Sequence, residues 1–280
     1  MMDTLSLTKS IPVKKSYDVI VCGGGVAGVA AAVSVANRGL SVLLLEKSNI
    51  LGGLATLGLI NLFVPMCNGR GKQIIFGLAE KWTRLSAEYG YDTIPEPWKN
   101  GEPTAYTESR YIQRYSPYIF ALQLTEEISK SGADLLFDCI ATEPIMDGNV
   151  CRGVIVESKS GTEFYPCRIL IDTTGDADLL RRAGAPTVAG QNFFTYIGKL
   201  ITLDSCRKAA ESGNIRDALS PTITGGGINL FGDNQPDNVP RWSGLTVEEV
   251  TDYLVTNQKI MLDKLKTTDR LSREIGRAHV

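Results

Sequence analysis

Short apolar runs and a glycine-rich turn alternate over the first fifty residues in an order that predicts strand, helix and strand. Residues 17–22 read Tyr-Asp-Val-Ile-Val-Cys, a β-branched apolar run typical of a parallel strand buried on both faces. Glycines follow at once, then an alanine-rich stretch, and then the apolar run 40–45, which ends on Glu46. We therefore expect a strand, a tight turn, a helix and a second strand within residues 17–46.

The pattern further along the chain predicts helices, then a group of strands, then a mixed region. Helical spacing of apolar residues covers 73–89 and 117–132. Alternating, β-rich segments separated by turn residues cover 133–141, 150–157 and 162–171. These segments predict a crossover sheet of short antiparallel strands over about 133–171, in which Cys151 and Cys167 are nearly opposite each other as free thiols.

The last ninety residues change character. An aromatic and aliphatic run at 191–203 predicts a strand, followed by a short helix near 205–212 and by loops at the glycines 225–227. Thr246-Val-Glu-Glu249 is a capping box, which predicts the start of a helix. We expect this region to begin an α+β substrate domain.

Three glycines after the first strand carry the candidate chemistry. Gly23, Gly25 and Gly28 fit G-x-G-x-x-G, in which the first glycine permits the turn, the second admits a pyrophosphate and the third lets the helix approach the strand. The free N–H groups and the dipole of the following helix favour an anion. Glu46 lies 18 positions after Gly28, close to the roughly 20 expected of a ribose-binding carboxylate. The sequence therefore predicts a dinucleotide site.

Composition narrows the function classes. The chain has 280 residues, 43% of them hydrophobic, and 29 basic residues against 31 acidic ones, which gives no sign of a nucleic-acid partner. No apolar run approaches the roughly 18 residues of a membrane span, and residues 1–16 lack a signal-peptide core, so we expect a cytoplasmic protein with a flexible N-terminal arm. The six cysteines form no C-x-x-C pair and no metal spacing, so no metal is expected.

Two further motifs make the dinucleotide prediction more specific. Gly52-Gly53 follows Glu46 closely, and the apolar strand 168–172 runs into Thr173-Thr-Gly-Asp176 and then Ala183-Gly-Ala-Pro186. This order resembles the glutathione-reductase-like flavoproteins with two dinucleotide-binding domains. It is similar in particular to the FAD-dependent oxidoreductase family of bacterial flavoproteins often labelled xanthan lyases, over roughly residues 17–190.

The resemblance implies an FAD/NAD(P)-binding Rossmann-like parallel sheet with an antiparallel crossover, FAD as the cofactor, and a set of contacts to it. By resemblance, Gly23, Gly25 and Gly28 would hold the pyrophosphate, and Glu46 would bind the adenosine ribose. Gly52 and Gly53 would lie at the ribityl side, and the backbone of Ala141 would lie at the adenine edge. Thr174, Gly175 and Asp176 would flank the cofactor from the returning strand. Asp172 and Asp178 are interpreted as cap or turn residues. Residues 57–70 would pass near the isoalloxazine ring, with Asn61, Asn68 and Arg70 as their polar members. No redox cysteine pair follows Gly53, which excludes the dithiol chemistry of the disulfide reductases.

The expected activity is transfer of hydride or electrons between a small-molecule substrate and bound flavin, with an electron acceptor and an oligomeric state that the sequence leaves open. No catalytic acid or base is assigned, because the single histidine, His279, lies at the terminus. The aromatic and arginine-containing segment 90–116 is interpreted as an ordered surface insertion or as a lid over an anionic substrate. An NAD(P)-only dehydrogenase and a non-enzymatic dinucleotide-binding scaffold remain as alternatives.

The domain organisation expected from these motifs has four parts. They are the arm 1–16, an FAD-binding domain 17–190, a partial substrate domain 191–274 and a non-native tail 275–280. The tail, Ile-Gly-Arg-Ala-His-Val, matches in one reading frame the start of a common sequencing adapter, ATC GGA AGA GCA CAC GTC. We therefore expect a C-terminally truncated fragment that lacks a last flavin contact.

Overall fold

The computed structural model describes residues 5–90, 93–190, 195–219, 222–226, 237, 239–267 and 274–279, and the chain divides into two compact units. Unit 1 comprises Met1–Leu57 and Tyr118–Thr187, and unit 2 comprises Gly58–Pro117 and Val188–Val280. Each unit is described by itself. The predicted domain bounds and the predicted tail stay predictions.

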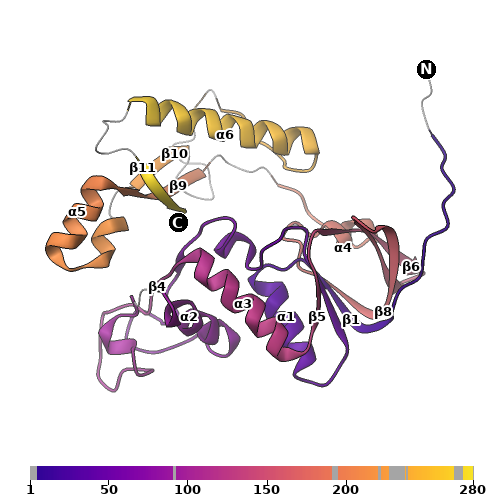
Figure 1. Ribbon diagram of the computed structural model, residues 1–280, viewed down its shortest axis with the longest axis horizontal. Helices are drawn as coiled ribbons and strands as arrows, with labels where there is room; N and C mark the ends of the chain where they lie inside the picture. The colour runs from indigo at the N-terminus through magenta and orange to yellow at the C-terminus, as the bar shows by residue number, and fades with distance from the viewer. Residues whose placement is uncertain are drawn as a thin grey trace. The chain divides into compact units, whose positions relative to one another are not determined.

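Unit 1 is a six-stranded sheet with helices (Figure 1). Its elements are β1 (Tyr17–Cys22), α1 (Val26–Ala36), β2 (Val42–Leu45), η1 (Gly53–Ala55), α3 (Pro117–Ser131), β5 (Asp134–Leu136), β6 (Cys139–Asp147), β7 (Val150–Ser158), β8 (Gly161–Asp172) and α4 (Asp178–Arg182). The strand order is β5-β2-β1-β8-β7-β6. Strands β5, β2, β1 and β8 run parallel, whereas β8, β7 and β6 run antiparallel. The predicted α/β class, parallel sheet and antiparallel crossover are confirmed.

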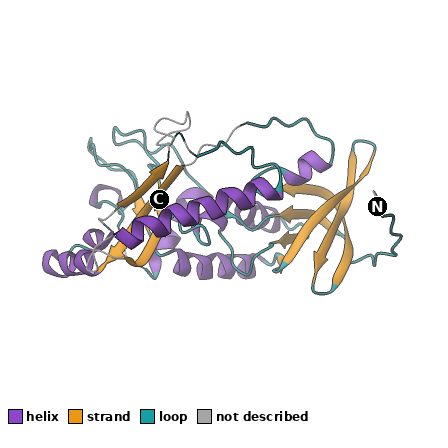
Figure 2. Cartoon of the chain, turned by 90° about the horizontal axis from the view of Figure 1, so that it is seen from above, coloured by secondary structure: helices purple, strands orange, loops and turns teal. Residues whose placement is uncertain are grey.

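Strand β8 joins the two halves of this sheet. Its first half pairs with β7, from Gly161 to Pro166, and its second half pairs with β1, from Cys167 to Asp172. Figure 2 draws the long crossover strands in orange. Because β8 runs parallel to β1 and beside it, the end of β8 lies at the same sheet edge as the ends of β1 and β2.

The apolar runs of β1 and β2 are continuous because both faces of these strands are covered. Val19, Ile20 and Val21 are each at most 3% exposed, and α1 packs on β1 and β2. The opposite face holds a core cluster that includes Ile20 and Leu43 together with the crossover residues Val154 and Val156. Each such side chain contributes roughly 1.5–3 kcal/mol on burial, so the position of the strand ends is strongly fixed.

Unit 2 combines the insertion between η1 and α3 with the C-terminal part of the chain. Its elements are β3 (Leu62–Phe63), α2 (Leu78–Glu88), η2 (Glu96–Trp98), β4 (Gln113–Arg114), β9 (Thr195–Thr202), α5 (Leu203–Ser212), η3 (Ile215–Leu219), β10 (Thr222–Gly226), α6 (Val247–Thr267), the long yellow helix of Figure 1, and β11 (Glu274–His279). β3 and β4 form one antiparallel pair, and β10, β9 and β11 form a three-stranded antiparallel sheet. Residues 90–116 are ordered where described, since the buried rings of Trp98 and Tyr111 stack with centroids 5.1 Å apart.

Two secondary-structure predictions in unit 2 were wrong in part. The helix expected from residue 73 begins only at Leu78, because Gly77 takes a left-handed φ of 71° and the preceding segment bonds instead to the Met66 carbonyl. Tyr89, the C-cap residue at the other end of this helix, is exposed. Gly225 and Gly226, expected in a loop, belong to β10, while Gly227 lies outside the described residues. Among the described residues, no helix is both long enough and apolar enough to cross a membrane.

Candidate functional site

Three segments that are far apart in the sequence meet at the carboxyl ends of the parallel strands of unit 1. The loop after β1 contacts the loop after β2, because the Gly52 N–H donates to the Gly24 carbonyl at 2.8 Å. It also contacts the segment after β8, because the Thr173 hydroxyl lies 2.8 Å from the Gly23 carbonyl oxygen. The motifs that the sequence analysis singled out at 23–28, 52–53 and 173–176 therefore form one surface.

Two of the fingerprint glycines are required by the packing of the chain itself. A Cβ on Gly28 would lie 1.8 Å from the Gly23 carbonyl oxygen. Gly23 has a left-handed φ of 109°, and a Cβ there would lie 2.3 Å from the Thr173 carbonyl oxygen. Any side chain at either position would force the strand ends and the helix start apart.

Gly25 is different, because nothing in the protein requires it to be glycine. Its φ of −63° and ψ of 178° suit any residue, and no atom lies within 4 Å of an added Cβ. Gly25 is also the N-cap of α1, with no side chain capping the helix and no acidic residue in its first turn. Open space in front of uncapped backbone N–H groups fits a phosphate that approaches too closely to tolerate a Cβ.

Glu46 lies beside this loop at the end of β2. Its side chain is almost fully buried, and its two carboxylate oxygens accept hydrogen bonds from the Gly24 N–H at 2.6 Å and the Ser48 N–H at 2.7 Å. These two bonds fix the carboxylate next to the glycine loop. A carboxylate accepts more than two hydrogen bonds, so further acceptor sites remain for ligand hydroxyls.

The Gly52-Gly53 turn is held in a conformation that glycine favours. Both residues have positive φ values, 104° and 54°. A Cβ on Gly52 would lie 2.3 Å from Thr56 Cγ2, and a Cβ on Gly53 would lie 3.2 Å from Gly25 Cα. The paired glycines therefore allow the second loop to lie against the first.

The returning strand ends in a turn organised by Asp172. One carboxylate oxygen accepts from the Thr174 N–H at 2.9 Å and hydroxyl at 2.7 Å, and the other accepts from the Leu179 and Leu180 N–H groups at 3.0 Å. Burial acts to raise the pKa of Asp172, but these hydrogen bonds outweigh burial and hold the pKa below its usual range. Asp172 thus caps α4, as expected, and Asp178 lies in the first turn of that helix.

The predicted residues of the Thr-Gly-Asp motif lie around this turn. Thr174 is half-buried and bonded to Asp172, whereas Gly175, with φ of 101°, and Asp176 are exposed. Ala141 lies in β6, which begins beside Glu46 because the Cys139 N–H donates to the Glu46 carbonyl at 3.3 Å. The roles of these residues toward a cofactor stay predictions.

Sequence reasoning missed two residues of this surface, Gly24 and Thr173, and a buried polar residue on the adjoining helix α3, Gln123. Gly24 is packed so closely that a Cβ would lie 2.6 Å from Leu51 Cδ2, and Thr173 bridges the ends of β1 and β8. The signals in the sequence were the extra glycine between Gly23 and Gly25 and the doubled threonine at 173–174. Gln123 on α3 gave no signal: its side chain is 4% exposed, and both its amide atoms lack a partner within the described part of the chain.

A dinucleotide cofactor fits these observations. The next residue, Leu124, has its Cδ1 3.1 Å from where a Cβ on Gly52 would be, so α3 lies against the Gly-Gly turn. Gln123 on that helix has an unpaired buried amide, which needs a polar partner. The open space at Gly25 and the uncapped start of α1 supply the anion-binding part. FAD carries both a pyrophosphate and neutral hydrogen-bonding groups.

The polar residues expected near the flavin ring belong to unit 2. Asn61 is 1% exposed, and neither of its amide atoms has a partner among the described residues. Asn68 instead shapes a turn, accepting from the Arg70 N–H at 2.8 Å, and both are exposed. Of the two arginines in the 90–116 segment, Arg110 is exposed and Arg114 is half-buried.

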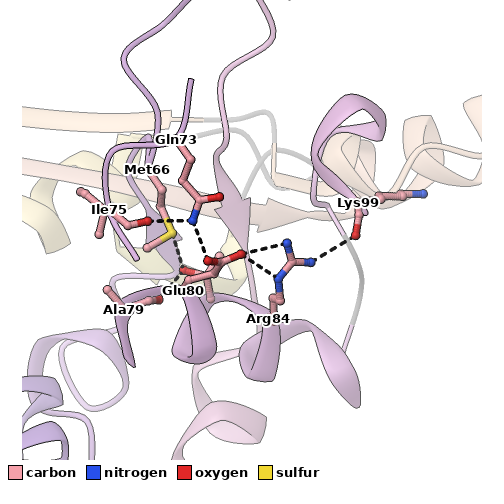
Figure 3. Close-up of polar contacts among 8 residues, drawn as sticks. Met66, Gln73, Ile75, Ala79, Glu80, Arg84 and Lys99 are labelled. Carbon is pink, nitrogen blue, oxygen red and sulfur yellow. Dashed lines mark hydrogen bonds and ion pairs between the residues drawn. The ribbon is translucent and has the colours of Figure 1, made fainter. Parts of the chain in front are cut away.

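Unit 2 also contains a polar cluster around α2 (Figure 3). The Glu80 carboxylate accepts from Gln73 Nε2 at 2.6 Å and pairs with Arg84 at 3.0 Å, while Arg84 Nη1 donates to the Lys99 carbonyl at 3.1 Å. Figure 3 shows Glu80 and Arg84 pointing toward each other. These bonds tie α2 to the segments before and after it, so we interpret the cluster as structural.

Comparisons with known proteins agree with the geometry. The model of the family described as FAD dependent oxidoreductase matches residues 18–244. A digeranylgeranylglycerophospholipid reductase of Methanoculleus marisnigri is 28% identical over 186 residues, which cover 62% of this chain and 43% of the relative. A vinyl phenol reductase of Lactiplantibacillus plantarum is 58% identical over 38 residues, 14% of this chain and 8% of the relative.

Among solved structures, a geranylgeranyl bacteriochlorophyll reductase-like protein from Thermoplasma acidophilum is similar, with a TM-score of 0.48 and 17% identity. The match covers 69% of this chain and 48% of that one. The chain thus spans less than half the length of the first curated relative that it matches.

Proposed function

Because this chain belongs to the FAD-dependent oxidoreductase family, with FAD as the cofactor, we propose that its unit 1 binds FAD on the surface formed by the three converging loops. The observation that carries this proposal is the contrast between Gly25 and its neighbours. Gly23, Gly24 and Gly28 are glycines because the protein's own atoms fill the space beside them, whereas the space beside Gly25 is open. A close-lying ligand explains that fourth glycine.

The residues of unit 1 would divide the binding between them. The N–H groups at the start of α1 hold the pyrophosphate, and Glu46 accepts from the adenosine ribose, since it already lies against the loop through the Gly24 N–H. Gly52 and Gly53 allow close approach of the ribityl side, and the backbone of Ala141 faces the adenine edge. Thr174, Gly175 and Asp176, which follow the returning strand β8, flank the cofactor.

Bound FAD supplies hydride or electron transfer through its isoalloxazine ring. The protein orients the ring and the substrate, and no residue is assigned as acid or base. We propose the reductive direction for the substrate, because the relatives named above are reductases. A geranylgeranyl chain and a vinyl group both contain carbon–carbon double bonds, so the proposed substrate class is a largely apolar molecule with such a double bond. We propose that the reaction takes place in the cytoplasm.

Two alternatives predict different behaviour. An NAD(P)-only dehydrogenase has no need of the Gly52-Gly53 turn that lies against Gly25, which disfavours it. A non-enzymatic scaffold would bind FAD without passing electrons. The two are distinguished from the proposal by cofactor content and by flavin reduction.

The test is purification and reconstitution with FAD. Under the proposal, the protein takes up FAD with oxidised-flavin absorbance bands and quenches flavin fluorescence, and Gly25→Val abolishes uptake. Protein that binds NAD but takes up no FAD would refute the proposal. Protein that binds FAD but whose chemically reduced flavin passes electrons to none of the alkenes tested would favour the scaffold.

A further inference from the structure

Two thiols face each other across the antiparallel crossover of unit 1. The ladder between β7 and β8 ends at the pair Gly153 and Pro166. The residue of β7 before Gly153 is Arg152, which has no partner on β6 because the register between β6 and β7 shifts there. Beyond this bulged residue Cys151 follows on β7, and Cys167 follows Pro166 on β8, so the two thiols lie at neighbouring positions just past the end of the β7–β8 ladder. The sequence pattern also predicts that they are nearly opposite.

Directly opposite residues of antiparallel strands have Cα atoms about 4.5–5.5 Å apart, which is within the range of about 4.4–6.8 Å that a disulfide spans. The two side chains interact directly: burial raises the pKa of Cys167 to about 12, and the charge of Cys151 and a hydrogen bond with it add to this effect. Both thiols are free in the structure, Cys167 buried and Cys151 half-buried.

We infer that Cys151 and Cys167 form a peroxide-sensitive thiol pair, in which Cys151 is oxidised first and Cys167 then closes a disulfide across the β7–β8 hairpin. The oxidant is hydrogen peroxide. Cys151 sulfur attacks one peroxide oxygen, the O–O bond breaks, and the leaving hydroxide takes up a proton, which leaves a sulfenic acid on Cys151. Cys167 sulfur then attacks Cys151 sulfur, the S–O bond breaks, and the departing hydroxide takes the thiol proton of Cys167. Two thiols have lost two electrons and peroxide has become two waters.

The other cysteines of the same core lack this combination. Cys22 and Cys139 are 1% and 3% exposed, and burial raises the pKa of each, that of Cys139 to about 11. Cys206 is half-buried like Cys151 but lies on α5 in unit 2. Within unit 1, Cys151 is thus the half-buried thiol, and Cys167 is the buried cysteine whose side chain is hydrogen-bonded to it.

The test uses the FAD-loaded protein treated with hydrogen peroxide, quenched with iodoacetamide under denaturing conditions and digested for mass spectrometry. We expect a peptide cross-linked between Cys151 and Cys167, lighter by two hydrogens than the sum of the reduced peptides and released by dithiothreitol. Cys206→Ser should leave this peptide unchanged, whereas Cys151→Ser and Cys167→Ser should each remove it.

A second readout is the melting midpoint. Because the cross-link closes the hairpin loop in the unfolded chain, oxidation should raise the midpoint by on the order of 5 °C in wild type and in Cys206→Ser, and not in Cys167→Ser. Sulfinic acid on Cys151 without any cross-link, or a cross-link that forms only in urea, would overturn the inference. The mapped peptide is read from wild-type protein, so the result stands even if a serine variant folds poorly.

Discussion

Replacing Gly25 by alanine should separate cofactor binding from folding. Its backbone already has φ and ψ that alanine adopts, and a Cβ meets no protein atom within 4 Å. The FAD-free variant should therefore be as stable as wild type, or more stable by up to about 1 kcal/mol, because alanine restricts the unfolded chain. A change of that size moves the melting midpoint by roughly 2–4 °C.

FAD binding by Gly25→Ala should be weaker, although the FAD-free variant is as stable as wild type. The added methyl group occupies the space proposed for a phosphate oxygen and removes about one charge-assisted hydrogen bond, which is worth about 1.5–3 kcal/mol. The Kd for FAD should therefore rise roughly 10- to 150-fold. Flavin fluorescence quenching on titration measures this Kd, and thermal denaturation of the FAD-free protein measures stability.

The matched control is Gly28→Ala, three residues further on in the first turn of α1. Its Cβ would lie 1.8 Å from the backbone oxygen of Gly23, which cannot move without shifting β1. We expect a loss of about 3 kcal/mol or more, the upper end of typical overpacking costs, and a melting midpoint lower by roughly 6–12 °C. Wild-type affinity in Gly25→Ala, or unfolding of Gly25→Ala to the extent seen in Gly28→Ala, would refute the reasoning.

Three other predictions concern unit 1 and the thiols. Thr173→Val keeps the shape of the side chain but loses the hydroxyl that binds the Gly23 carbonyl, so it should cost about 1 kcal/mol in urea unfolding and weaken FAD binding; unchanged values for both would contradict that role. The folded-state pKa of Asp172 is lowered, so its contribution to stability is present above the unfolded pKa of about 3.9 and is lost as pH falls through the folded value. Asp172→Asn turns one of the two acceptor oxygens into an amide donor, so it should cost about 1–3 kcal/mol at pH 7 and progressively less under more acidic conditions, and an equal cost at pH 7 and pH 3 would argue against the cap. In native protein, a thiol reagent should label Cys151 and Cys206 and leave reoxidation of the reduced flavin by an alkene substrate largely intact, with all six cysteines reacting after unfolding; loss of turnover while FAD stays bound would show that a thiol takes part.

The strand–turn–helix–strand unit at the start of the chain was predictable because its signals are local. A buried parallel strand reads as a continuous apolar run, and glycine appears where the chain must turn, whatever the rest of the protein does. The same holds for the crossover hairpins and for Thr246, whose hydroxyl accepts from the Glu249 N–H at 3.2 Å at the start of α6. The start of α2 was misplaced because hydrogen bonds to the Met66 carbonyl, eight and nine residues earlier, rather than helical spacing, govern residues 74 and 75.

Only the tertiary structure decided which glycines serve the chain and which face open space. Gly23, Gly25 and Gly28 look alike in the motif, but the carbonyl of Thr173, 150 residues away in sequence, is what excludes a side chain at Gly23. Likewise the buried amide of Gln123, which has no partner among the described residues, follows from packing that no local pattern encodes. Sequence periodicity reports the environment along one strand or helix, whereas the site is made where the ends of β1, β2 and β8 meet, and that meeting depends on pairing between segments far apart in the chain.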